Sequence, residues 1–204
     1  MAFEKSGGSV GLPDGYTAVN YIQSSGTQWI EMGVAPSQNT KVVLKIKINS
    51  LTNQGASLIG SRTDLNSTDQ FTTYLDNYGG SRFLFRVDGQ TSATPFSGVK
   101  TNTFYTVTLS ASEMRFELED GTIAFSSTFS VSDFTSAVTM ALFRAKGVSG
   151  VCFQGKIYGC KHYNGDKLIQ DFVPCLDSAG VPCMYDFVGK TAFYNQGTGS
   201  FTWG

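Results

Sequence analysis

The fold is decided by Gly155-Lys-Ile-Tyr-Gly-Cys-Lys-His-Tyr163, which runs through Asn164-Gly165-Asp166 into Lys167-Leu-Ile-Gln-Asp-Phe-Val173. An Asn-Gly pair between two β-prone runs predicts a hairpin, because a type I′ turn requires positive φ at both central residues. The segments 191–195 and 200–203 flank a Gly-rich tetrapeptide and predict a second hairpin. We therefore expect the chain to end in antiparallel sheet.

Alternation with a period of two continues upstream of this stretch. In residues 41–48 the apolar side chains share one face, and three lysines share the other: Lys41, Lys45 and Lys47. Lysines on a solvent-facing strand discourage edge-to-edge pairing, so we interpret them as aids to solubility rather than to ligand capture. Further strands are expected at 57–60, 82–87, 103–109, 114–119, 122–125 and 138–144, and no convincing helix is present.

The tail, together with Leu12-Pro-Asp-Gly-Tyr16 and Tyr21-Ile-Gln-Ser-Ser-Gly-Thr-Gln-Trp-Ile-Glu-Met-Gly33, resembles the laminin-G-like/concanavalin A-like jelly-roll modules of phage and gut-bacterial proteins. The resemblance covers residues 12–204. It implies an all-β fold, an antiparallel two-sheet jelly-roll β-sandwich, whose first strand lies beside the last ones. It also implies a non-catalytic binding or structural module. We expect residues 1–11 to form an N-terminal arm, either flexible or docked on a partner.

The composition of the chain argues against nucleic acid and membranes as partners. The chain has 204 residues, of which 15% are charged, and a formal net charge of −1, so no basic field is available to attract nucleic acid. No apolar run approaches the roughly 20 residues that a membrane helix needs. The first residues lack the order of a signal peptide, and we expect synthesis in the cytoplasm.

Four cysteines lie late in the chain, and their spacing gives no paired C-x-x-C motif, so a zinc site is not expected. Cys152 and Cys160 are interpreted as small buried apolar residues. A symmetric turn at residues 177–180 would bring Cys175 opposite Cys183 at bridging distance. A disulfide between these two and a pair of free thiols both remain open.

No catalytic residues are expected. Glu117 and Glu119 share a face and are the only acidic cluster comparable to that of a jelly-roll glycoside hydrolase, but the core face is already taken by Met114, Phe116 and Leu118. The third acid of that pattern is absent. His162, two residues after Cys160, is interpreted as a cross-strand neighbour on a solvated face rather than a catalytic base.

Two kinds of ligand site are considered in the loops: a calcium site and a sugar site. Calcium is often bound by laminin-G-like folds, and the loop positions offer four candidates: Asp64, Asp69, Asp76 and Asp88. Their spacing matches no known motif, and turn-forming aspartate is the alternative, so no cofactor is predicted. Sugar recognition combines an exposed ring with hydrogen-bonding groups, and the best such patch holds Asp76, Asn77, Tyr78 and Arg82. Trp29 is interpreted as a packing residue, and Trp203 as the cap at the end of a sheet.

The function that the resemblance implies is that of a non-enzymatic bacteriophage virion surface protein, as a capsid decoration, a head fibre or a tail component. Its arm would attach to other virion proteins, its loops would bind bacterial surface glycans, and several copies would act together through avidity. A purely structural virion-stabilising protein that binds no glycan is the first alternative. A glycan-cleaving jelly-roll enzyme is the second.

Overall fold

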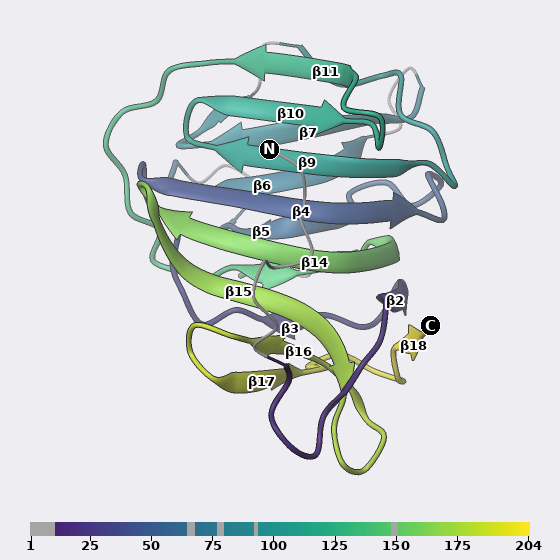
Figure 1. Ribbon diagram of the computed structural model, residues 1–204. Coiled ribbons are helices and arrows are strands. Elements are labelled where there is room, and N and C mark those ends of the chain that lie inside the picture. The colour runs from purple at the N-terminus through teal and green to yellow at the C-terminus, as the bar shows by residue number, and fades with distance from the viewer. Residues whose placement is uncertain (1–10, 65–67, 77–79, 92–93, 148–150) are drawn as a thin grey trace.

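The computed structural model describes residues 11–64, 68–76, 80–91, 94–147 and 151–204. These residues form two β-sheets packed face to face and contain no helix, which confirms the all-β, two-sheet antiparallel sandwich. Figure 1 shows the larger sheet in front of the smaller one. No helix long and apolar enough to cross a membrane occurs in this described part of the chain.

The larger sheet has eleven strands. Its main path runs, in spatial order, through β11 (Ile123–Thr128), β10 (Glu113–Glu117), β9 (Phe104–Ser110), β4 (Thr40–Ile48), β14 (Gln154–Asn164), β15 (Lys167–Leu176), β16 (Pro182–Asp186) and β17 (Thr191–Tyr194). Three short strands complete it: β1 (Thr17–Ala18) pairs with β15, and β2 (Ile22–Ser25) pairs with both β14 and β18 (Thr202–Trp203).

The smaller sheet has seven strands, in the order β3 (Ile30–Glu31), β12 (Ala141–Leu142), β5 (Ser57–Ser61), β6 (Phe71–Asp76), β7 (Arg82–Val87) and β8 (Gln90–Thr91), with β13 (Ala145–Lys146) parallel to β5. The strand expected at 138–144 is much shorter than predicted. It ends at Leu142 because Phe143 has φ of 65°, outside the extended region.

The core lies between the two sheets. On β4 the alternation is as predicted, with Val42, Leu44, Ile46 and Ile48 fully buried. Phenylalanines of the facing sheet, such as Phe71 and Phe85 with ring centroids 5.0 Å apart, fill the space opposite. The interpretation of the three lysines as edge protection is wrong, because β4 is an inner strand that pairs with β9 and β14.

The hairpin of β14 and β15 is confirmed, but its turn differs from the expected one. Asn164 pairs with Lys167, so the two turn residues are Gly165 and Asp166. Only Gly165 has positive φ, at 59°, and this matches a type II′ rather than a type I′ turn.

The second predicted hairpin is wrong. β17 pairs with β16, while β18 crosses to the N-terminal block and pairs with β2. Two hydrogen bonds hold this crossing: the Thr198 N–H donates to the Thr27 carbonyl at 3.2 Å, and the Trp29 N–H donates to the side-chain Oδ1 of Asn195 at 3.1 Å. The first and last blocks of the sequence are therefore neighbours, as the resemblance implied.

We expect Gly197→Ala to lower the free energy of unfolding by about 1–3 kcal/mol, because the new Cβ would lie 1.9 Å from the backbone oxygen of Thr27. Urea denaturation would measure the change. Gly11→Ala is the control, since its Cβ would meet nothing within 4 Å. Equal midpoints for both variants would contradict the close approach of the two blocks.

Candidate functional site

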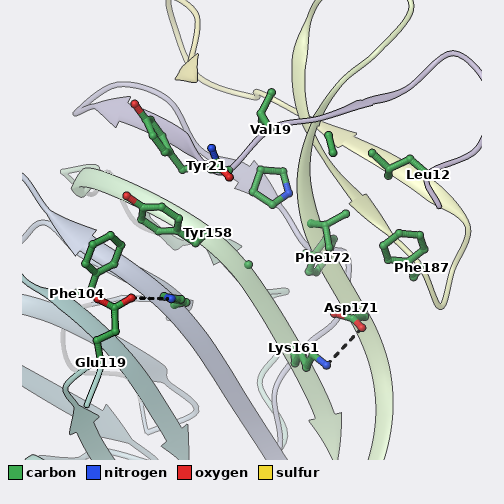
Figure 2. Close-up of a pocket in the computed structure, with 16 residues that line it drawn as sticks. Leu12, Val19, Tyr21, Phe104, Glu119, Tyr158, Lys161, Asp171, Phe172 and Phe187 are labelled. Atoms are coloured by element: carbon green, nitrogen blue, oxygen red, sulfur yellow. Dashed lines mark hydrogen bonds and ion pairs between the residues drawn. The ribbon is translucent and has the colours of Figure 1, made fainter. Parts of the chain in front are cut away.

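A groove of about 680 Å³ lies on the outer face of the larger sheet (Figure 2). Its base is formed by β4, β14 and β15, and one side is formed by the segment that runs from Leu12 to Tyr21. The groove faces away from the core, because the inward side chains of β4 fill the space between the sheets. Most of its lining residues are partly exposed, whereas Phe172 belongs to the core beneath it.

A β-bulge in β14 positions the middle of the groove. Ile157 and Cys160 are three residues apart and both fully buried, which the alternation of a regular strand does not allow. The register shifts between Ile157 and Gly159, so Tyr158 and Gly159 together occupy the place opposite Lys45 of β4. Tyr158 points outward by the regular alternation after Ile157, and the bulge then returns Cys160 to the core.

The same point is where β14 changes partner along one edge. Residues 154–157 pair with β2, and residues 160–164 pair with β15. Between these two partners, residues 19–21 connect β1, which pairs with β15, to β2, which pairs with β14. The groove opens at this change of partner, with Tyr21, Tyr158 and Asp171 around it (Figure 2).

Three aromatic rings form a row along the groove, which we call the ring row: Tyr21, Tyr158 and Phe104. The ring centroids are 5.4 Å apart between Tyr21 and Tyr158, and 5.0 Å apart between Tyr158 and Phe104. All three side chains are half-buried, so each ring keeps an exposed part. Burial raises the pKa of Tyr158, and the neighbouring Tyr21 and Glu119 raise it further, which keeps its hydroxyl protonated.

Two ion pairs lie beside the ring row. Lys45 Nζ is 3.2 Å from Glu119 Oε1, and Lys161 Nζ is 3.7 Å from Asp171 Oδ2 (Figure 2). Burial raises the pKa of the Asp171 carboxyl, and the Lys161 ammonium opposes that shift. These side chains are partly exposed and can donate to or accept from a bound molecule.

The other end of the groove is apolar and lies next to a small second core. Leu12, Val19 and Phe187 line this end. Behind them, Cys175 and Cys183 pack with Tyr185 under the N-terminal segment. The two cysteines are cross-strand partners, as expected, with 3.4 Å between their Sγ atoms as free thiols. A disulfide between them stays a prediction.

The loop patch predicted for sugar binding lies on the other sheet. Arg82 Nη2 is 2.7 Å from Asp76 Oδ2, and the two residues are cross-strand partners at the end of β6 and β7. This ion pair closes the hairpin. Asn77 and Tyr78 lie outside the described residues, so the patch stays a prediction. Trp29 packs against the core with the Arg144 guanidinium 5.1 Å from its ring, and Trp203 is half exposed at the end of β18.

The aspartates considered for calcium have other partners. Asp69 accepts from the Thr63 hydroxyl and the Ala137 N–H, and Asp88 accepts from the Ser132 N–H. Asp64 lies in the loop after β5. Across the described ranges, no three His, Cys, Asp or Glu side chains gather closely enough to hold a metal ion. Calcium at these positions stays an untested alternative to the expectation that no cofactor is bound.

The two glutamates considered for catalysis have different cationic partners. Glu117 pairs with Arg115 at 3.1 Å, whereas Glu119 pairs with Lys45. The interpretation of His162 as a solvated residue is wrong: it is 1% exposed, and its Nδ1 is 2.9 Å from Gln170 Oε1. Cys152 and Cys160 are buried as predicted, and burial raises the pKa of both thiols.

The ring row was missed by sequence reasoning. Tyr21, Phe104 and Tyr158 come from three distant parts of the chain, and no local pattern joins them. The one signal of this site in the sequence was Lys45, which the alternation of residues 41–48 correctly predicted to point outward. Its place on an inner strand, beside the rings, depends on the pairing of β4 with β9 and β14.

No family model matches the chain, and no curated protein matches it in sequence. Among solved structures it is similar to a Bacteroides ovatus protein for which carbohydrate binding has been suggested, with a TM-score of 0.61 and 12% identity over 92% of this chain. The chain spans 60% of that protein's length. This similarity supports the β-sandwich fold.

Two further similarities are weaker. One is to the heptameric SAP-like pentraxin of Limulus polyphemus, with a TM-score of 0.43 and 12% identity over 73% of this chain and 75% of that one. The other is to domain 4 of the GH43 arabinanase AbnA of Geobacillus stearothermophilus in complex with arabinotriose, with a TM-score of 0.40 and 17% identity over 74% and 70%.

We expect stability to fall as the pH is lowered from 7.5 to 5.5. Burial lowers the pKa of His162, although Gln170 and Asp186 raise it, so the unfolded chain binds more protons below its ordinary pKa of about 6.5. The loss begins near that value and ends below the lowered folded pKa. His162→Gln should flatten this dependence in urea titrations across the range. An unchanged slope would contradict a neutral, buried His162.

Proposed function

We propose that this β-sandwich is a non-catalytic module that binds a carbohydrate in the groove on the outer face of its larger sheet. The observation that carries the proposal is the ring row, flanked by two ion pairs. Exposed rings stack on the apolar face of a pyranose, and charged side chains at their margin hold the hydroxyl groups.

The side chains are positioned before a ligand arrives. Each ring contacts the next, and Lys45 and Lys161 are each paired with a carboxylate. A site whose side chains are already ordered loses less entropy on binding, which favours affinity for a weakly interacting ligand such as a sugar. The volume of about 680 Å³ falls within the usual range for small-molecule sites.

Binding is favoured over cleavage by the partners of the acids. A glycoside hydrolase needs two carboxyl groups that are free to act on the glycosidic bond. Glu117 and Glu119 are instead each held in an ion pair, 3.1 Å from Arg115 Nη2 and 3.2 Å from Lys45 Nζ. Release of reducing sugar that is lost in Glu119→Gln would favour the enzyme instead.

The wider role that we propose is display of this module, in several copies, on a bacteriophage virion, with bacterial surface glycans as ligands. Its support is the resemblance of residues 12–16 and 21–33 to phage jelly-roll modules, and repeated copies would raise weak affinity through avidity. The rival is a structural virion protein. A glycan array without signal, together with tight binding to empty capsids, would favour that rival.

We expect Tyr158→Ala to weaken binding to a polysaccharide about 10-fold, since loss of one stacked ring removes roughly 1.4 kcal/mol. A glycan array would identify the polysaccharide, and isothermal titration would measure the change. Tyr163→Ala is the matched control, because Tyr163 is half-buried on the same strand and lies outside the groove. Equal affinity of the two variants would contradict the site.

A further inference from the structure

Two lysines lie directly opposite each other beside the ring row. Lys47 of β4 and Lys156 of β14 are cross-strand partners on the outer face of the larger sheet, and both are half-buried. Like charges in this position repel each other and destabilise a sheet. The pair is therefore a cost to the fold that packing alone does not explain.

The two ammonium groups mark both ends of the ring row. Lys156 Nζ is 3.9 Å from the ring centroid of Tyr21, and Lys47 Nζ is 5.0 Å from that of Phe104. Such contacts hold the aliphatic stems along the rings, and the two lysines lie beside the groove rather than among the residues that line it. A sugar stacked on Tyr158 would lie between these two charges.

Carboxylates are too few to balance these charges locally. Four lysines lie beside the ring row, namely Lys45, Lys47, Lys156 and Lys161, whereas the carboxylates there are Glu119 and Asp171, which pair with Lys45 and Lys161. Within the ranges that the structure describes, Lys47 and Lys156 have no carboxylate within 4.0 Å. The whole chain has a formal net charge of −1, so the excess of positive charge is a property of this site.

We propose that the carbohydrate bound in the groove is acidic, and that Lys47 and Lys156 attract the carboxylates of its uronic acids. This inference rests on the proposed function. A carboxylate beside either ammonium would lower the repulsion between the two lysines, while a sugar ring stacks on the ring row. Because the site is partly exposed, the electrostatic contribution is weakened by salt.

The test uses matched polymers that differ only in charge. Polygalacturonate, alginate and hyaluronan are each compared with their methyl esters by isothermal titration at low ionic strength. We expect at least one acid polymer to bind about 10-fold more tightly than its neutral ester. We also expect 0.5 M NaCl to reduce that preference strongly. A preference for the esters, or none, would overturn the inference.

Variants locate the charge preference. The double variant Lys47→Met/Lys156→Met should lose the preference for the acid form and still bind the neutral ester, because methionine keeps an apolar stem over the rings. Lys41→Met is the matched control, since Lys41 lies on the same face of β4 and contacts Tyr163 instead. Equal loss of the preference in both variants would overturn the assignment to Lys47 and Lys156.

The stability of the double variant tests the inference without a ligand. Removal of the repulsion should leave the melting temperature of the double variant unchanged or higher. A clear decrease would mean that the two lysines support the fold, and would overturn their role as an unbalanced binding pair.

The outcomes separate this inference from the proposed function. Binding to no polymer of either kind, or binding that Tyr158→Ala leaves intact, would count against the carbohydrate site itself. Equal binding of acid and ester that is lost in Tyr158→Ala would preserve the site and overturn only its charge preference. Tighter binding of an oligothymidylate than of any polysaccharide would overturn both, because a nucleic acid also offers rings and negative charge.

Discussion

The arrangement of the outer face depends on the way in which one edge of β14 serves two partners. Backbone groups of a strand must be paired along its length, and β14 satisfies this with β2 at its start and with β15 at its end. The change occurs where the bulge at Tyr158 and Gly159 interrupts the ladder with β4. This single irregularity shifts the alternation of β14 by one residue, so that Cys160 returns to the core after the outward Tyr158, and it lies where the groove opens.

The two faces of β4 have different roles: the inward face stabilises the fold, and the outward face contributes to the candidate site. Its inward residues join a continuous apolar core, and burial of such side chains is the main source of stability in a sandwich. Its outward lysines contribute little to stability, since partly exposed ion pairs are worth about 0–1 kcal/mol. A rigid inner strand nevertheless holds Lys45 and Lys47 in fixed places beside Phe104, and this makes the outer face suitable for binding.

The mixture of aromatic and polar residues placed the predicted sugar site in a loop, whereas the described structure offers a candidate on the sheet face. Loop residues such as Asp76 and Arg82 were attractive because polar groups cluster there in sequence, but in space they pair with each other. The rings of Tyr21, Tyr158 and Phe104 are isolated in sequence and adjacent in space. Short-range patterns favour residues that are neighbours along the chain, so a site assembled from the residue before β2 and from β9 and β14 gives no local signal.

The sequence by itself determined the strands and their inward faces, because alternation of apolar side chains and Gly-containing turns are local properties. It predicted the core residues of β4, β7 and β10, the first terminal hairpin, and the position of Cys175 opposite Cys183. Pairing between distant strands was decided only by the tertiary structure. Three features could not be predicted locally: the pairing of β18 with β2, the bulge in β14 and the burial of His162. They follow from contacts across more than a hundred residues or from a shift of one residue in register. Neither the long-range contacts nor the register shift can be predicted from local composition, since the same residues would satisfy either pairing.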